Sequence, residues 1–413
     1  MFAQAIPIDL STNPLETLYE LGVGQDYVFL KLGKRDVFFV NKPDLIQWTF
    51  THNAIGRGRF FKVFSRWLGN GALVSEGQSH RVMRRILLPA FNAEAQKFYM
   101  QIITRDAPSL LDEWREGEID LAAALFDLVY QATIRAVYGL TRLTPGETHE
   151  LLGVLARGSE TFLGRAMLPE GHYFESGRVR HPIVDEALEY MWAHWQSTPL
   201  TRVLDSLPAQ EKYDQTLTMI SASLDTSMAA LVWMFHLFSQ NPSAFEAFCK
   251  DARTSPLEEA ARGYAALALH ETLRLFPTGG WLNTRELFEP SSVCGFDLPA
   301  GTNVFVSSWV TQRNSRYFDM PERFQPERFL QPITPWTYFP FGGGAHTCLG
   351  RPLSLVELPY LAALVVHLFD VQFLQGNNIQ LHYRIGLTPN GHIPARVHRR
   401  DGKTASHEGF GSD

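Results

Sequence analysis

The residue of this chain with the clearest potential for chemistry is a cysteine that follows a glycine-rich loop. Cys348 ends the run Phe341-Gly342-Gly343-Gly344-Ala345-His346-Thr347-Cys348, and the pattern predicts a helix that starts near Leu349. Glycine allows a backbone to approach a flat object closely. The free N–H groups and the positive dipole end of a helix lower the pKa of a nearby thiol. Cys348 is therefore a candidate nucleophile or metal ligand, and the alternative is a buried structural cysteine.

The overall composition excludes several classes of protein. The chain has 413 residues, and 37 basic against 43 acidic residues give a net charge of −6, which excludes nucleic-acid binding through bulk positive charge. Three cysteines without a CxxC spacing exclude a disulfide scaffold and a four-cysteine zinc site. No basic targeting segment and no run of about 20 apolar residues is present, so the sequence predicts a cytoplasmic protein without a membrane span. The nucleotide-binding patterns GxGxxG and GxxxxGK[ST] are also missing, so an oxidoreductase of this sequence would receive its electrons from another protein.

The hydrophobic patterns predict one mainly α domain over residues 1–413, with a small β region and an ordered core of about 15–395. Short β-branched and aromatic runs predict strands in 26–46 and 278–310, and segment 311–348 has little periodicity. A loop is expected at Leu168–Gly171, and the polar tail 400–413 is expected to be disordered. Helical spacing predicts helices over 79–92, 118–141, 214–240, 257–276 and 349–369.

The cysteine loop resembles the haem-binding signature of the cytochrome P-450 family, FxxGxxxCxG, at every fixed position. Those positions are Phe341, Gly344, Cys348 and Gly350. The resemblance implies the mainly α cytochrome P-450 fold with a small β region, and haem b as the cofactor. It also implies that the thiolate of Cys348 is the proximal ligand of the haem iron.

A second stretch, Glu271-Thr272-Leu273-Arg274, places an acid and a base three residues apart on one helix face. Taken alone, the pair would be an ordinary surface ion pair worth under about 1 kcal/mol. It resembles the ExxR motif of the same family, whose third member is an arginine before the haem loop. Arg328 fits that position, and the resemblance implies a buried ion network of three residues.

A third stretch places polar residues inside the apolar helix predicted at 214–240. A buried Asp225 is costly without a partner or a purpose, and Thr226 can bond back to the carbonyl four residues earlier. The alternative is a polar stripe that faces solvent. The stretch resembles the oxygen-activation motif of the family, which implies that Asp225 and Thr226 relay protons while dioxygen is split. Ser223 departs from the family pattern, which usually has glycine there, and this leaves the geometry of the oxygen groove open.

Four basic residues match positions that bind the haem propionates in the family. His80 and Arg84 are four residues apart on the basic helix, and the alternative for them is a solvated basic face. Arg285 and His346 match the other two positions. Charge-assisted hydrogen bonds to carboxylates are the role that the resemblance implies. Arg81 and Arg85 are interpreted as surface residues or as part of a basic patch for a redox partner.

The resemblance implies a soluble bacterial monooxygenase that inserts one atom of O2 into a C–H bond. A separate ferredoxin and its reductase would deliver electrons from NAD(P)H, which therefore acts only indirectly. Two alternatives remain at this point: a peroxide-driven peroxygenase, against which Asp225 and Thr226 argue, and a haem-binding sensor without catalysis.

The substrate is expected to be a large apolar molecule, because apolar stretches lie where the family forms its pocket. The alternative is that these residues are simply core. Three further stretches, 310–313, 326–329 and 391–396, look most like the soluble bacterial carotenoid hydroxylases. Ring hydroxylation of a carotenoid is therefore the preferred hypothesis, with fatty-acid hydroxylation second, and uptake of such a substrate would bring the enzyme to a membrane surface. The expected pocket stretches are 60–64, 67–68, 162–163, 167–168, Leu224 and 280–282.

Overall fold

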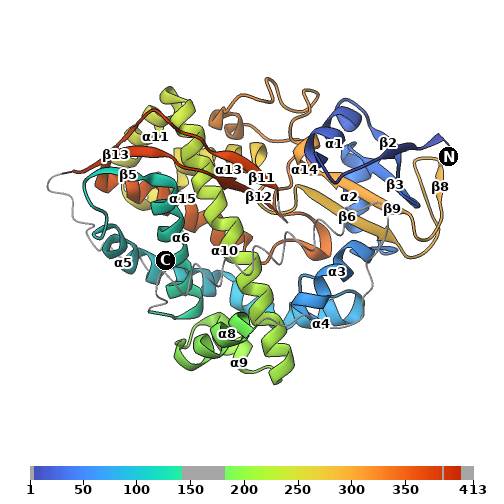
Figure 1. Cartoon of the computed structure of the whole chain (residues 1–413), viewed down its shortest axis with the longest axis horizontal. Coiled ribbons are helices and arrows are strands. Elements are labelled where there is room, and N and C mark those ends of the chain that lie inside the picture. Colours follow the sequence, from blue (N-terminus) through green and yellow to red (C-terminus); the bar gives the residue numbers. More distant parts are fainter. Residues whose placement is uncertain (1–3, 142–181, 384–385, 401–413) are drawn as a thin grey trace.

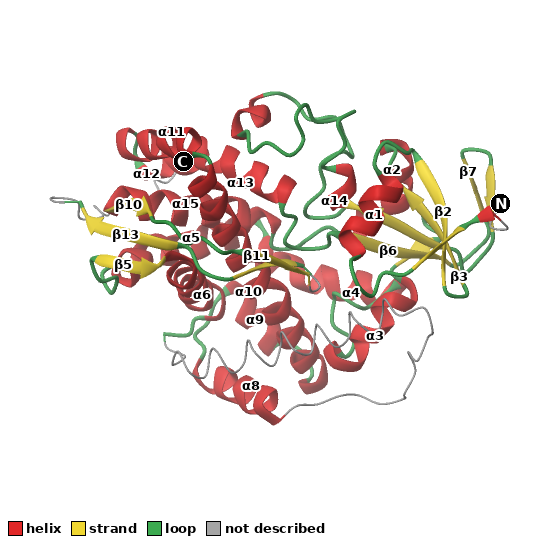
Figure 2. Cartoon of the chain, turned by 45° about the horizontal axis from the view of Figure 1, so that its top comes forward, coloured by secondary structure: helices red, strands yellow, loops and turns green. Residues whose placement is uncertain are grey.

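A computed structural model describes residues 4–141, 182–383 and 386–400 of the chain. Most of the strands gather at one end of the molecule, and most of the helices lie in the rest, with a smaller sheet at the opposite end (Figure 1, Figure 2). The loop predicted at 168–171 and residues 401–413 of the predicted tail lie outside the described residues.

The main sheet joins the N-terminal part of the chain to a segment about 250 residues later. Its strand order is β1-β2-β3-β9-β6-β4, and β3 pairs in parallel with β9. The alternation of buried Val37 and Phe39 on one side with Phe38 and Val40 on the other lets β3 pack on both faces. The strands are β1 (Ile6–Ile8), β2 (Tyr27–Leu32), β3 (Arg35–Val40), β4 (Ile55–Gly56), β6 (Leu282–Leu287) and β9 (Asn303–Ser307).

Three smaller sheets complete the β part of the described structure. β10 (Phe369–Phe373), β13 (Pro394–Arg399) and β5 (Gly117–Asp120) form one sheet, and two hairpins join β11 (Gln380–Tyr383) to β12 (Leu387–Asn390) and β7 (Ser291–Val293) to β8 (Phe296–Leu298). The small β region predicted from both ends of the sequence is confirmed.

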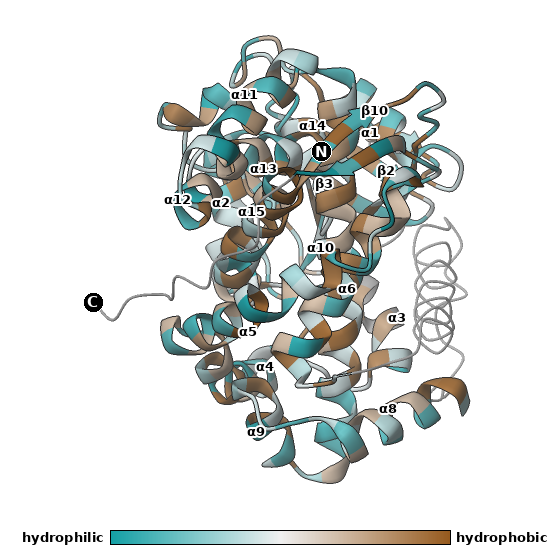
Figure 3. Ribbon diagram, turned by 90° about the vertical axis from the view of Figure 1, so that its left-hand side faces the viewer, coloured by the Kyte–Doolittle hydropathy of each residue, from teal (hydrophilic) through white to brown (hydrophobic). Residues whose placement is uncertain are grey.

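The helices pack around two long central ones, α10 (Ala209–Gln240) and α15 (Arg351–Leu368). Ribbons in Figure 3 carry hydrophobic and hydrophilic stretches side by side, as expected for helices with one face in a core. The other described helices are α1 (Pro14–Gly22), α2 (Pro43–Thr51), α3 (Gly58–Leu68), α4 (Gly77–Leu87), η2 (Leu88–Phe91), α5 (Ala93–Leu111), α6 (Leu121–Tyr138), α8 (Pro182–His194), α9 (Pro199–Asp205), α11 (Pro242–Thr254), α12 (Leu257–Arg262), α13 (Tyr264–Leu275), α14 (Ser308–Thr311), η3 (Pro326–Leu330) and η4 (Gly344–His346).

Two helices of the described residues, α10 and α15, are long and apolar enough to cross a membrane by length and composition alone. In each, 67% of the apolar window is buried inside the protein. Core helices of a globular fold have this property, because their apolar surface is covered by neighbouring helices on several sides.

The helix predicted over 214–240 begins five residues earlier, at Ala209, and the helix predicted over 79–92 is α4 followed by η2. Two other predicted helices differ from the structure because of tertiary contacts. The segment predicted as a helix over 118–141 starts as strand β5, because residues 117–120 pair with β13, and Asp120 then caps α6 by accepting a hydrogen bond from Ala122 N. The helix predicted over 257–276 is two helices, α12 and α13, that break at Gly263. In both cases a tertiary contact decides the boundary, since Tyr264 N after the break donates to Asp251 Oδ2.

The predicted ion network of three residues is confirmed. Glu271 and Arg274 are fully buried and form two hydrogen bonds, Arg274 Nε to Glu271 Oε2 at 2.7 Å and Arg274 Nη2 to Glu271 Oε1 at 2.8 Å. Arg328 Nε donates to Glu271 Oε1 at 3.0 Å. Arg274 Nη1 also donates to the carbonyls of Gln312 and Pro321, so α13 holds the irregular segment that leads to the cysteine loop.

We predict that Glu271→Ala yields little folded haem protein. Loss of the carboxylate leaves Arg274 buried without its charge partner, which costs about 3–5 kcal/mol. That is a large share of a typical stability of about 5–15 kcal/mol. Soluble yield and haem content are the measurements, with Asp205→Ala in the exposed Lys212–Asp205 pair as the control. Equal yields of the two variants would contradict a stabilising network.

A second buried acid lies between α15 and α6. Glu357 is 2% exposed and accepts a hydrogen bond from Thr133 Oγ1 at 2.9 Å. Burial raises the pKa of Glu357 to about 7, against an ordinary value of 4.5, and the Thr133 hydroxyl offsets only part of this effect. The carboxyl is therefore protonated in the folded protein under mildly acidic conditions.

This acid makes stability depend on pH in a defined direction. Between pH 4.5 and about 7 the folded state binds the proton more tightly than the unfolded chain, so stability falls as pH rises through this window and is constant above it. We predict that Glu357→Gln removes this component, which amounts to about 3 kcal/mol over the window at about 1.4 kcal/mol per pKa unit. The measurement is thermal unfolding at pH 5 and pH 8, with exposed Glu118→Gln as the control. Parallel pH profiles of parent and Glu357→Gln would refute the raised pKa.

Candidate functional site

The loop that carries Cys348 is shaped by close contact with α2. Gly342 and Gly344 have φ angles of 67° and 64°, in the left-handed region that favours glycine. A Cβ on Gly344 would lie 1.9 Å from the carbonyl oxygen of Phe50, so only glycine fits there. Cys348 N donates to the carbonyl of Phe341 at 3.0 Å and closes the loop. The position of the cysteine is thus tied to α2.

Cys348 lies just before α15, and solvent reaches its side chain although protein groups crowd around it. The backbone N–H groups of Gly350 and Arg351 donate to Sγ and lower the thiol pKa, as the sequence predicts. Burial has the larger effect, and the pKa of Cys348 is raised above its ordinary 9.0. The prediction of a lowered thiol pKa is therefore wrong for the protein alone, because desolvation outweighs the helix terminus. A metal cation bound at Sγ would supply the missing positive charge, which fits a ligand role.

The structure brings the four predicted anion-binding residues together in one basic cluster. The rings of His80 and His346 have centroids 3.9 Å apart. Arg84 and Arg285 are close enough to this group to shift its pKa values, since both lower the pKa of Arg57. The cluster consists of Arg57, His80, Arg84, Arg285 and His346.

Arg57 was not predicted from the sequence. Its Nε donates to His346 Nδ1 at 3.0 Å, and its backbone N–H donates to the carboxylate of Glu76. Its side chain stacks on the ring of Phe61, with Cζ 4.3 Å from the ring centroid. The sequence offers only a weak signal, an arginine between Gly56 and Gly58, because 289 residues separate it from His346.

The basic cluster carries more positive charge than its surroundings neutralise. Burial lowers the pKa of Arg57 to about 9 and that of Arg285 to about 10. The pKa of His80 falls to about 4, first through burial and then through Arg57 and Arg84. His346 has a pKa lowered to about 3, mainly by burial, although it lies 3.5 Å from Glu76. Among the described residues, Glu76 is the carboxylate that raises the pKa values of this cluster, so the site suits a ligand with further negative charges.

An accessible strip interrupts the burial of α10 at the predicted acid–alcohol pair. Ala222 is exposed, and Ser223, Asp225 and Thr226 are partly exposed, although the helix is buried on both sides of them. Thr226 Oγ1 donates to the carbonyl of Ala222 at 2.8 Å, which confirms the predicted back-bond. A Cβ on Gly279 would lie 3.6 Å from Thr226 Cγ2, so Thr226 faces the chain that follows α13.

Ser223 points away from this strip toward α6. Its Oγ lies 3.3 Å from Tyr138 Oη, within hydrogen-bond distance. Tyr138 is fully buried on α6. The Ser223 hydroxyl, where the family usually has glycine, thus has a hydrogen-bond partner in the core. It is therefore directed away from the oxygen groove expected beside Thr226.

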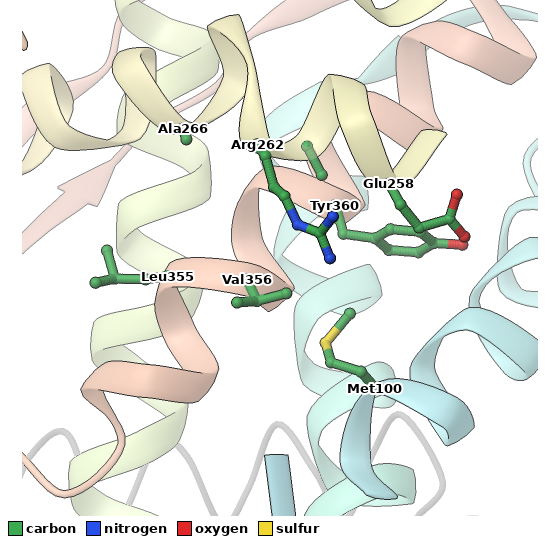
Figure 4. Close-up of a pocket in the computed structure, with 8 residues that line it drawn as sticks. Met100, Glu258, Arg262, Ala266, Leu355, Val356 and Tyr360 are labelled. Atoms are coloured by element: carbon green, nitrogen blue, oxygen red, sulfur yellow. The ribbon is translucent and has the colours of Figure 1, made fainter. Parts of the chain in front are cut away.

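A separate surface pocket of about 210 Å³ is lined by residues of α5, α12, α13 and α15 (Figure 4). Leu355, Val356 and Met100 form apolar parts of its wall, and Glu258 and Arg262 add charges. None of the predicted site residues lines it, so this pocket is distinct from the region of Cys348 and α10.

Comparison with known proteins agrees with the geometry. The model of the cytochrome P-450 family matches residues 22–143 and 196–393, which is most of the chain. The chain belongs to the cytochrome P-450 family. As a member it is a haem-dependent monooxygenase, and the site fits the haem: a cysteine thiol for the iron, a glycine loop with no room for a Cβ, and buried cations for the propionates.

Relatives of this P-450 match over nearly their whole length. Cyclooctatin synthase of Streptomyces melanosporofaciens is 26% identical over 92% of this chain and 90% of its own. Pentalenene oxygenase of Streptomyces avermitilis is 24% identical over 86% and 87%. Among solved structures, a six-coordinated cytochrome P-450 from Thermus thermophilus has a TM-score of 0.75 at 26% identity and covers 95% of this chain and 99% of its own. The predicted fold class and family are confirmed.

We predict that Arg57→Ala speeds haem loss without changing the spectrum of the bound haem. Removal of this buried cation weakens the attraction to a propionate but leaves Cys348 in place. The rate of haem transfer to excess apomyoglobin is the measurement, and a rise of about tenfold corresponds to about 1.4 kcal/mol. Arg81→Ala on the exposed side of α4 is the control. Equal transfer rates for both variants would show that Arg57 does not hold the haem.

Proposed function

We propose that this P-450 inserts one atom of O2 into a C–H bond of a large apolar substrate, and that the ring of a carotenoid is its target. The observation that carries the oxygen-insertion part is the acid–alcohol pair Asp225–Thr226 on the accessible strip of α10. A sensor has no need of this pair, and a peroxygenase that starts from hydrogen peroxide consumes no net protons, whereas splitting of O2 does.

Cys348 would bind the iron of haem b, and the basic cluster would bind its propionates. The haem, when bound, supplies the iron at which O2 is activated. The chain contributes the N–H groups of Gly350 and Arg351, which donate to Sγ and stabilise its negative charge. Arg57, His80 and His346 would hold the propionates, beside the carboxylate of Glu76.

Thr226 and Asp225 would hold and move protons on the α10 side. The bond from Thr226 Oγ1 to Ala222 O fixes the direction of the hydroxyl, so that its oxygen accepts a further hydrogen bond on the accessible side. Asp225 is partly exposed and can exchange protons with solvent. A carboxyl beside a fixed hydroxyl forms a short route from solvent to the strip.

The pocket residues expected from the sequence divide into two groups. Phe64, Trp67, Leu68, Leu224 and Trp281 are buried in the main core, so for these the interpretation as core holds. Phe61 and Leu282 are only partly buried and stay as candidates to contact the substrate. Segments 162–163 and 167–168, and the side chains of Phe60, Lys62 and Val63, lie outside the described residues.

The preference for a carotenoid rests on the sequence stretches, and the names of relatives support only an apolar, unsaturated substrate. In the structure, Gln312 and Arg328 from those stretches belong to the network around Glu271, so they support the fold more than the substrate. Pentalenene oxygenase and cyclooctat-9-en-7-ol 5-monooxygenase are named for an unsaturated hydrocarbon and an unsaturated alcohol. Both names favour an apolar olefin over a fatty acid as the substrate class.

A separate ferredoxin with its reductase is the proposed electron source, with NAD(P)H as the indirect donor. Arg81 and Arg85 are exposed on α4, the helix that also carries His80 and Arg84. An acidic ferredoxin would bind to these two arginines, which lie on the same helix as the proposed haem-binding residues. Salt would weaken the association because it screens the charges. We propose a cytoplasmic bacterial enzyme that meets its lipophilic substrate at the membrane surface.

The test is turnover of the reconstituted enzyme. β-Carotene, pentalenene and a long-chain fatty acid are each incubated with ferredoxin, reductase and NADPH, and in parallel with hydrogen peroxide alone. A hydroxylated carotenoid ring in the NADPH arm is the expected result. Product from pentalenene or the fatty acid alone would overturn the carotenoid assignment. Equal turnover with hydrogen peroxide alone would favour the peroxygenase, and no substrate-induced spin shift or product would favour the sensor.

We predict that Thr226→Ala keeps its haem but wastes reducing equivalents. Without the hydroxyl, protons are delivered less selectively and more NADPH ends in hydrogen peroxide. The ratio of product to NADPH consumed should fall several-fold, while Thr226→Ser, which keeps the hydroxyl, should stay near the parent. Tight coupling in Thr226→Ala would contradict the proton-relay role. Asp225→Asn should slow turnover more than it increases peroxide leakage.

A further inference from the structure

The segment between α3 and α4 is fastened to α10 by two consecutive side chains. Gln215 is fully buried, and its Oε1 accepts from Ala72 N at 2.9 Å while its Nε2 donates to the carbonyl of Asn70 at 3.2 Å. Asp214 Oδ2 accepts from Asn70 N at 2.8 Å. Three backbone groups of a loop are therefore paired with side chains of one helix.

The glycines of this segment make the close approach possible. A Cβ on Gly71 would lie 1.8 Å from Thr218 Oγ1, one turn beyond the two clamping residues. Gly69 has a φ of 61°, and a Cβ there would lie 2.4 Å from the carboxyl carbon of Asp214. The loop backbone thus lies directly on α10, in a position that no larger residue at Gly71 would allow.

This contact falls on the same face of α10 as the accessible strip. Gln215 and Thr226 are eleven residues apart, close to three full turns and about 16 Å along the axis. The face is covered at Gln215 and Thr218 by the loop, and it becomes accessible at Ala222. The loop is therefore the wall at which the accessible strip ends.

The same segment continues into the basic cluster. Leu73 is partly exposed although its neighbours Ala72 and Val74 are buried, and Glu76 contacts both Arg57 and His346. One short stretch of chain thus connects the wall on α10 to the carboxylate of the cluster. A shift of residues 70–72 would move both.

We propose that Asp214 and Gln215 are positioning residues that hold segment 69–76 as the end wall of the substrate cavity, and that this clamp sets which ligands reach the haem face. The clamp acts through hydrogen bonds to backbone groups, so its effect does not depend on the side chains of the loop. Small ligands that need no movement of the wall should be insensitive to it. Bulky ligands should enter and leave faster once the clamp is broken.

The test compares two azoles that bind the haem iron of the purified holoenzyme, so it needs no knowledge of the natural substrate. In Gln215→Leu, the association and dissociation rates of 4-phenylimidazole should rise about tenfold, while those of imidazole stay within about twofold. Amide hydrogen exchange of residues 70–76 should quicken by at least the same factor, since Ala72 N and Asn70 O lose their partners. Gln240→Leu, the same change at an exposed position near the end of α10, is the control and should change neither measurement.

A second variant tests the clamp without touching its hydrogen-bonding side chains. Gly71→Ala should push the loop away from Thr218 and give the same selective rise for 4-phenylimidazole, and Gln215→Asn replaces Gln215→Leu if that protein does not fold. Unchanged exchange at 70–76, equal changes for both azoles, or the same effect in Gln240→Leu would overturn the proposal. A wrong carotenoid assignment would leave all of these results unaffected.

Discussion

The buried carboxylate of Glu271 is the interaction on which the rest of the site depends. It accepts from Arg274, Arg328 and the backbone N–H of Gln325, and so joins α13 to a segment that has no regular structure of its own. That segment runs from residue 311 to the cysteine loop with only short helical turns. The network thus sets the path of the chain toward Cys348, together with the contact of Gly344 on α2 and the start of α15. The cost of burying the three charges is offset because each is hydrogen-bonded to another or to backbone carbonyls.

A second constraint is the charge imbalance around the haem region. Arg57, His80, Arg84, Arg285 and His346 converge from different elements, and burial lowers the pKa of each. Such a cluster is unfavourable on its own and favourable around a dianionic ligand. If the haem propionates bind here, as proposed, part of the haem affinity would come from relief of the repulsion among the arginines. The Cys348 thiol follows the same principle. Burial raises its pKa, and a metal cation bound to the sulfur would lower it again.

α10 connects these two regions to the proposed substrate side. Its accessible strip carries Thr226, its first turns hold the loop that leads to Glu76, and its inner face holds Ser223 on Tyr138. One helix thus sets the position of the Thr226 hydroxyl relative to the loop at residues 70–72. The helix is straightforward to predict from its apolar run and from Asn241-Pro242 at its end.

Local patterns in the chain were enough to predict the family, the main helices and strands and the ion network, and the structure and the comparisons confirm these. The roles of Cys348, Asp225 and Thr226 stay predictions. These depend on spacing, glycine and proline positions, and motif residues that stay close in the chain. Folding in three dimensions was needed to define the position of Arg57 beside His346, the direction of Ser223, the start of α6, the break at Gly263 and the raised thiol pKa. Each of these depends on a partner far away in sequence or on desolvation: His346 for Arg57, Tyr138 for Ser223, β13 for the strand before α6, Asp251 for the break at Gly263, and the protein surroundings for the thiol. Periodicity reports which face of an element is apolar, but it cannot report which distant group that face meets.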